Sequence, residues 1–222
     1  MPSRMSPSGF KELSGTTLFE PLKFGAIQLQ HRVLMAPLTR MRGSMEADGV
    51  FAPGDLNVEY YSQRATNGGF QLTEACPISR QVWFRTKECY NGALYTNFNQ
   101  ACGYPGVPGI FTPGQIAGWK RVTNAVHEKG GFIYCQLWHV GRATVPALLD
   151  GHDCVSSSSI PLEGNCLNGD SYAATPPKVM TIDDVNDIVK EFAAAAKRAV
   201  EAGFDGVEIH GYVRAMATYN ID

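Results

Sequence analysis

The chain has 222 residues, of which 44% are hydrophobic and 18% are charged, and its formal net charge is −2. This composition is that of an ordinary globular domain, and without a cluster of lysine and arginine it excludes nucleic acid or an anionic membrane as the main partner. Residues 1–17 are polar and lack the apolar run of a secretory signal, and no later stretch could span a membrane. We therefore expect a disordered N-terminal tail and a cytoplasmic protein.

The cysteines carry no sign of a metal site or of a disulfide framework. They show neither C-x-x-C pairs nor spacings to histidine that suit a metal, and a chain of this length does not need disulfides for stability. We therefore expect free thiols at all six positions, Cys76, Cys89, Cys102, Cys135, Cys154 and Cys166.

The first predicted elements are a hairpin, a strand and a helix. Residues 18–29 hold two short alternating runs broken at Pro21 and Gly25, which predicts a small hairpin. Residues 32–37 form a compact apolar run that ends in proline, as is typical of a buried parallel strand. Residues 56–66 then predict a helix that ends at the following Asn-Gly-Gly.

Strands and helices go on alternating towards the C-terminus. Strands are predicted at 70–75, 132–138 and 207–209, and helices begin at the N-caps Thr112 and Thr181. The predicted apolar face of the last helix comprises Val185, Ile188, Val189, Phe192, Ala196, Ala199 and Val200. This order predicts an α/β fold of four βα units, with a parallel sheet that is covered on both faces or closed into a barrel.

Two long segments do not fit this repeat. Residues 80–102 have no clear period, and residues 143–178 are polar and rich in glycine, serine and proline. Long loops within a compact domain are usually functional or wrongly assigned. We therefore treat 80–102 as an atypical insertion and 143–178 as a surface excursion.

Six fragments occur in one order along the chain. They are MAPLTR at 35–40, YSQRA at 61–65, TEA at 73–75, GYPGVPGI at 103–110, CQLWHVGR at 135–142 and AGFDGVEIHG at 202–211. Together they resemble the Old Yellow Enzyme family of flavin-dependent ene reductases, particularly its fungal members and the plant oxophytodienoate reductases. The resemblance covers residues 18–211 apart from the insertion.

The resemblance implies a TIM barrel that binds FMN at the carboxyl ends of its strands. This chain would supply only the four or so N-terminal βα units, as a partial barrel that follows the hairpin. It also implies a ping-pong reaction, in which NADPH or NADH reduces FMN and the flavin N5 then gives hydride to the β-carbon of an α,β-unsaturated aldehyde or ketone. The expected partners are therefore FMN, a nicotinamide and a small enone or enal.

Matched position by position, the resemblance assigns flavin contacts at three strand ends. The loop after the first strand would lie against the isoalloxazine, with the Thr39 hydroxyl tuning the ring. Ala75 would bring a small residue close to the flavin, and Gln136 would hydrogen-bond its pyrimidine edge. The loop residues are Ala36, Pro37, Leu38 and Thr39.

Two further matches concern the substrate. Trp138 would form a wall of the pocket, and His210 would be the first of two residues that hydrogen-bond the substrate carbonyl and stabilise its developing charge. If the resemblance to the family is set aside, we expect Thr39 to be a loop hydroxyl, Trp138 to pack in the core and His210 to be a structural histidine. Gln136 is more informative, because an amide within an apolar strand must find partners.

The chain departs from the family pattern after His210-Gly211. The positions of the second carbonyl ligand and of the proton-donating tyrosine hold Val213 and Ala215. The chain also has four predicted βα units where a barrel needs about eight. We therefore expect a truncated form that is inactive or impaired, or alternatively a non-catalytic half-barrel that self-associates through open sheet edges as a binding or assembly module.

One hypothesis about the gene explains both the insertion and the tail. Codons for Gly211-Tyr212-Val213 can contain GTAYGT, a common intron 5′ splice signal, so that residues 212–222 would be translated intron. Residues 82–101 would be a second retained intron. We predict that transcript sequencing finds a spliced message lacking both segments, and a mature message that always contains them would contradict the hypothesis.

Overall fold

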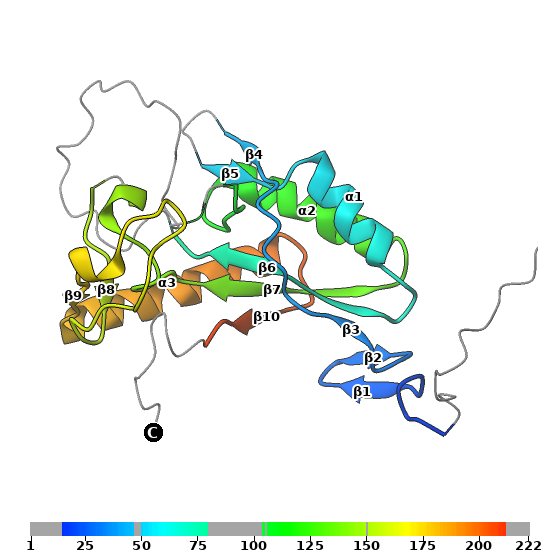
Figure 1. The fold of residues 1–222 in the computed structure, drawn as a ribbon. Coiled ribbons are helices and arrows are strands. Elements are labelled where there is room, and N and C mark those ends of the chain that lie inside the picture. The colour runs from blue at the N-terminus through cyan, green and yellow to red at the C-terminus, as the bar shows by residue number, and fades with distance from the viewer. Residues whose placement is uncertain (1–14, 47–49, 80–103, 105, 150, 212–222) are drawn as a thin grey trace, which may run out of the picture.

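A computed structural model describes residues 15–46, 50–79, 104, 106–149 and 151–211 of the chain (Figure 1). The predicted insertion, the C-terminal tail at 212–222 and most of the N-terminal tail lie outside these residues. The described elements are β1 (Leu22–Phe24), β2 (Ile27–Leu29), β3 (Leu34–Met35), β4 (Ser44–Met45), β5 (Phe51–Ala52), α1 (Asp55–Arg64), β6 (Phe70–Pro77), α2 (Pro113–His127), β7 (Phe132–Trp138), the 3₁₀ turn η1 (Pro146–Leu148), β8 (Val155–Ser156), the 3₁₀ turn η2 (Tyr172–Ala174), β9 (Lys178–Val179), α3 (Ile182–Glu201) and β10 (Gly206–Ile209).

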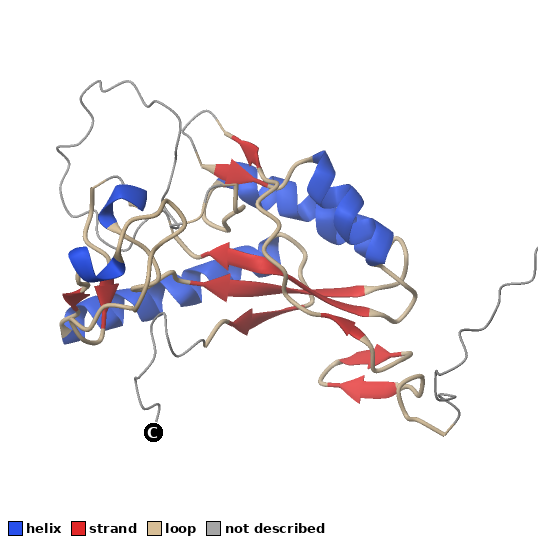
Figure 2. Ribbon diagram, viewed as in Figure 1, coloured by secondary structure: helices blue, strands red, loops and turns tan. Residues whose placement is uncertain are grey.

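The central sheet, whose strands are drawn red in Figure 2, consists of four parallel strands. They pair in the order β10-β7-β6-β3. Among these four strands, each lies beside the one that comes before it along the chain, as expected of successive βα units. The α/β class and the parallel sheet are therefore confirmed. Within the described residues the sheet is not closed into a barrel, since β3 and β10 are its two edges. The first strand is shorter than predicted, because only Leu34 and Met35 pair with β6.

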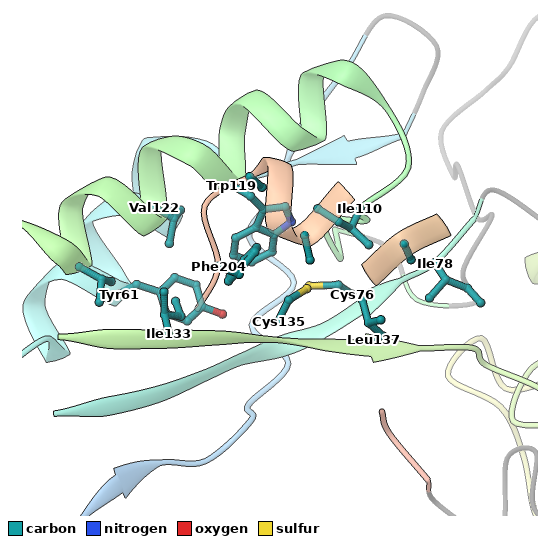
Figure 3. Packing of buried hydrophobic residues seen from close by; sticks show 14 of the residues in the cluster. Tyr61, Cys76, Ile78, Ile110, Trp119, Val122, Ile133, Cys135, Leu137 and Phe204 are labelled. Carbon is teal, nitrogen blue, oxygen red and sulfur yellow. The ribbon is translucent and has the colours of Figure 1, made fainter. Parts of the chain in front are cut away.

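The main hydrophobic core lies between the sheet and helices α1, α2 and α3 (Figure 3). Trp119 of α2 is fully buried, with its ring centroid 5.9 Å from that of Tyr61 and 5.5 Å from that of Phe204. Alternate strand residues complete this core, which identifies the helix-covered side of the sheet. The free thiols expected from the sequence are confirmed for the four described cysteines, Cys76, Cys135, Cys154 and Cys166, all of which are buried.

The predicted N-terminal hairpin is confirmed as the antiparallel pair β1–β2. Its residues Ile27 and Leu29 pack against Phe70, and the same cluster includes Leu72, Phe132 and Tyr134. Because side chains alternate along a strand, these residues lie on the side of the sheet opposite to the helices. We call this side the hairpin face; the hairpin covers it at the amino ends of the strands (Figure 1).

Both predicted N-caps are confirmed. The Thr112 hydroxyl accepts a hydrogen bond from Gln115 N at 3.0 Å, and the Thr181 hydroxyl accepts one from Asp184 N at 3.3 Å. The predicted glycine stop of the first helix is wrong, since α1 ends at Arg64 with an extended Ala65. No helix in the described parts of the chain combines the length and the apolarity needed to cross a bilayer.

The predicted apolar face of α3 is only partly buried. Ile188 and Ala199 are buried as expected, but Val189 and Val200 are 61% and 69% exposed. Ala195, which the prediction left out, is fully buried. Helical period alone does not say which part of a broad apolar surface is covered, and the small alanines are the residues that approach the sheet.

The chain on the two sides of the insertion is held together at its base. Ile110 N donates to Pro77 O at 3.0 Å. Arg198 of α3 then donates from Nε to Ile110 O at 2.7 Å and from Nη2 to Ile78 O at 2.8 Å. The end of β6 and the segment leading to α2 are thus joined directly and also through one guanidinium.

The surface excursion contains more structure than predicted. Val155 and Ser156 pair in parallel with Lys178 and Val179 as β8 and β9. Val155 and Met180 then pack on Ile188 of α3. The excursion is therefore attached to the helix layer.

We predict that Asp205→Ala lowers the free energy of unfolding by about 1–3 kcal/mol, because it leaves a partly buried amide without its acceptor. Asp205 Oδ2 accepts from Ile133 N at 2.8 Å and lies 2.9 Å from His127 Nε2, so one carboxylate links α2, β7 and the start of β10. Urea unfolding measures the change. Asp187→Ala is the control, since its ion pair with Lys190 is exposed and should contribute less than about 1 kcal/mol. Equal losses in the two variants would contradict this role.

Candidate functional site

The residues assigned from the motifs lie at the carboxyl ends of the four parallel strands. The arrowheads of β6, β7 and β10 point the same way in Figure 1, and the loop at 36–41 follows β3. Parallel sheets bind ligands at this edge, because loops from successive strands converge there. The structure thus brings the predicted positions to one edge of the sheet.

A β-bulge in β6 determines which β6 side chains lie on the hairpin face near the carboxyl edge of the sheet. Leu72 pairs with Tyr134 and Ala75 with Gln136, so β6 has one residue more than β7 between the two pairs. The extra residue turns Ala75 onto the same face as Leu72. The hydroxyl of Thr73 replaces a backbone acceptor by accepting from Gln136 N at 2.9 Å.

Ala75, Gln136 and Glu208 lie side by side on three neighbouring strands, β6, β7 and β10. Gln136 pairs with Ala75 on one side and with Glu208 on the other. Gln136 Nε2 donates to Glu208 Oε2 at 3.4 Å, the only hydrogen bond that this side chain makes with the described residues. The sequence motifs assign no role to Glu208, although its alternation with Val207 and Ile209 places it on the opposite face from them.

Trp138 and His210 come one step nearer the end of the sheet. Trp138 is 9% exposed, and its ring centroid lies 5.3 Å from that of Tyr104. The backbone of His210 continues the ladder, since His210 N donates to Leu137 O at 2.9 Å. Alternation places the His210 side chain on the same face as Glu208.

The loop after β3 exposes its side chains. Ala36, Leu38 and Thr39 are exposed, Leu38 to 50%, whereas Pro37 is half-buried. The backbone of the loop is nevertheless fixed to β6, because Arg40 N donates to Glu74 Oε2 at 3.0 Å. The loop thus presents a hydroxyl and apolar groups from an anchored backbone.

Glu74 is a second residue that the motif assignments missed. It is fully buried in the bulge, where Asn57 Nδ2 donates to its Oε1 at 3.3 Å. Its own backbone amide donates to the Tyr61 hydroxyl at 2.8 Å. Burial raises the pKa of Glu74 to about 7, although hydrogen bonds from the Arg40 and Met41 amides, the Arg40 charge and Asn57 act against this rise.

His139 also lies at this edge, directly after β7. Burial lowers the pKa of His139 to about 4, so the ring is neutral at physiological pH. Its Nδ1 accepts from Gly141 N at 3.0 Å, which leaves the proton on Nε2. The ring of His139 therefore stabilises the turn after the strand.

The groups at this edge fit a flat ligand with a hydrogen-bonding rim. Gln136 has donor and acceptor capacity that the described residues do not fill, Ala75 adds little bulk beside it, and Thr39 offers an exposed hydroxyl. A flavin ring has these requirements along its pyrimidine edge and N5. The described residues contain no cluster of three or more His, Cys, Asp or Glu side chains able to hold a metal.

The fold and the site together define an α/β protein with a parallel sheet and a candidate ligand site at its carboxyl edge. A profile of the NADH:flavin oxidoreductase / NADH oxidase family matches residues 17–213. The chain belongs to this family, whose members use FMN with a nicotinamide as reductant and form a TIM barrel. The resemblance to the Old Yellow Enzyme family is thereby confirmed, and the expected cofactors, FMN with NADPH or NADH, are those of the family.

Curated relatives support the same assignment. The chain is 57% identical over 194 residues to the flavin oxidoreductase hxnT of Emericella nidulans, covering 87% of this chain and 45% of that protein. It is 42% identical over 198 residues to the NADP-dependent oxidoreductase lnbE of Aspergillus flavus (87% and 44%) and 38% identical over 201 residues to 12-oxophytodienoate reductase 2 of Arabidopsis thaliana (87% and 46%). The chain therefore spans about half the length of the curated relatives it matches.

We predict that Glu74→Gln removes part of the pH dependence of stability. Because the folded pKa of about 7 lies above the ordinary value of 4.5, the folded chain keeps a proton that the unfolded chain has lost, and stability falls as pH rises through this window. The contribution of Glu74 to that fall is about 3 kcal/mol at most. Urea unfolding at pH 4.5 and 7.5 should show a smaller fall in the variant than in the unmodified chain.

The matched control is Glu20→Gln, which changes a carboxyl on an exposed side chain, 60% accessible to solvent. It should keep the pH dependence of the unmodified chain. Identical pH dependence in all three proteins would show that the buried carboxyl does not titrate in this window.

Proposed function

We propose that this chain is the N-terminal, FMN-facing part of an ene reductase that reduces the C=C bond of α,β-unsaturated carbonyl compounds with NADPH or NADH. The observation that carries the proposal is the row of Ala75 and Gln136 on the hairpin face, at the carboxyl edge of a parallel sheet, in a chain of this family. The fold implied is a partial barrel of about four βα units.

Each residue would act through ordinary binding chemistry. Gln136 would hold the pyrimidine edge of FMN, while Ala75 and the Pro37–Thr39 loop would lie against the ring. When bound, FMN supplies the hydride chemistry. His210 would donate a hydrogen bond to the substrate carbonyl oxygen and stabilise the charge that develops there. Trp138, packed against Tyr104, would form one wall of the pocket and exclude water.

The sequence gives no proton donor at the family position, where Ala215 stands in place of tyrosine. Loss of a general acid typically lowers a rate by about 10²- to 10⁴-fold. We therefore propose that this chain is inactive or strongly impaired as a reductase on its own.

The exposed apolar surface favours a second candidate, a non-catalytic half-barrel that assembles with a copy of itself. Ile209 is 63% exposed on the edge strand β10, and Val189 and Val200 are exposed on the neighbouring α3. An open edge strand with exposed apolar side chains promotes pairing with another chain. The partner would be a second copy that pairs along β10.

Size-exclusion chromatography with detection of flavin absorbance separates the two candidates. We predict that FMN co-elutes with the chain and that Gln136→Leu weakens FMN binding about 10-fold or more, because it removes a buried hydrogen-bonding amide. Gln28→Leu is the control, since Gln28 lies in the hairpin at the other end of the sheet. A colourless, soluble dimer would contradict FMN binding and support the assembly module, and NADPH-driven enone reduction by a yellow protein would contradict impairment.

A further inference from the structure

Glu74 combines three properties that a packing residue does not need. It is a carboxyl with no exposed surface, it lies in the bulge immediately before Ala75, and its acceptors face a loop 34 residues earlier in the chain. Burying a carboxyl is unfavourable unless its oxygens are hydrogen-bonded. Its hydrogen-bond donors therefore indicate what the carboxyl holds in place.

One of these donors is a backbone amide of the loop after β3. Arg40 N donates to Glu74 Oε2 at 3.0 Å. Arg40 follows directly on Thr39, the loop residue with the exposed hydroxyl. The carboxyl therefore fixes the backbone at the point where the loop leaves the ligand edge.

The backbone at this point is in an unfavourable conformation. Met41 has a φ of 55°, in the left-handed region of backbone conformation, which residues other than glycine rarely adopt. Strain of this kind persists only where surrounding contacts hold it, and it is concentrated at ligand sites. The hydrogen bond to Glu74 from the amide of the preceding residue, Arg40, is a contact of this type.

The remaining contacts of Glu74 make it rigid. Asn57 Nδ2 donates to Oε1 at 3.3 Å, and Asn57 Oδ1 in turn accepts from Gly54 N at 3.0 Å at the start of α1. The Tyr61 hydroxyl accepts a hydrogen bond from the backbone amide of Glu74 at 2.8 Å. The carboxyl is thus held by α1 on one side and holds the loop on the other.

We propose that Glu74 is a positioning residue that sets the conformation of the 36–41 loop, and through it the placement of Thr39 against the flavin ring. The second part rests on the proposed function, whereas the first concerns the free chain. Glu74 acts through the loop and touches neither the flavin nor the substrate. The bulge has two effects. It turns Ala75 towards the ligand edge, and it directs the carboxyl of Glu74 to the backbone of the loop.

Hydrogen exchange on the 222-residue chain tests the first part. Glu74→Gln offers one acceptor oxygen in place of two to the Arg40 amide and the Asn57 side chain, so one of these hydrogen bonds is lost. We expect exchange at the Arg40 amide to become about 10-fold faster. Asp205→Ala serves as a control for general destabilisation. It acts at the amino end of β10, so exchange at the Arg40 amide should change no more than global unfolding does. Unchanged exchange in Glu74→Gln would overturn the proposal.

A rescue variant separates positioning from simple loss of stability. Met41→Gly removes the penalty of the left-handed conformation, so Glu74→Gln/Met41→Gly should regain part of the loop order and of the FMN affinity lost in Glu74→Gln. We expect Glu74→Gln to bind FMN about 10-fold more weakly and Asp205→Ala to bind as the unmodified chain does. Normal FMN affinity in Glu74→Gln, despite faster exchange at the loop, would overturn the second part. If the unmodified chain binds no FMN, the proposed function fails, and the exchange data alone then decide whether Glu74 sets the loop.

Discussion

The candidate site depends on one extra residue in β6. Without the bulge between Leu72 and Ala75, strict alternation would turn Ala75 towards the helices and away from Gln136. Because of it, Ala75 joins Gln136 and Glu208 in one row, while Glu74 is buried where it meets the loop after β3. A single irregularity in hydrogen bonding thus arranges both a small ligand-facing residue and the support of a neighbouring loop.

Local signals in the sequence were sufficient for most of the framework. Thr112 and Thr181 cap their helices through side-chain hydrogen bonds that need only nearby residues, and residues 132–138 have the apolar content of a buried strand. The motif residues could be placed at one edge because parallel strands all end there. These are properties of short segments and of simple topology, which explains why they were predictable.

The features that escaped prediction depend on contacts between distant segments. The sequence Thr73-Glu74-Ala75 does not predict a bulge, because the bulge arises from the pairing of β6 with β7. Glu74 can be buried because Arg40, 34 positions before it, and Asn57, 17 positions before it, supply hydrogen-bond donors. Val189 is exposed because no described segment covers it. The roles of Thr39, Trp138 and His210 came from family motifs and could not be derived from period or composition.

The Arg198 contacts have a consequence for how this gene can change over evolution. One guanidinium and one backbone hydrogen bond close the chain on both sides of residues 80–103, so the sheet does not need that stretch to bring β6 and α2 together. Lengthening a loop that is already closed at its base has only a small entropic effect, about 0.6 kcal/mol for each doubling of length. Insertions into the gene at this junction would therefore have little effect on the stability of the fold.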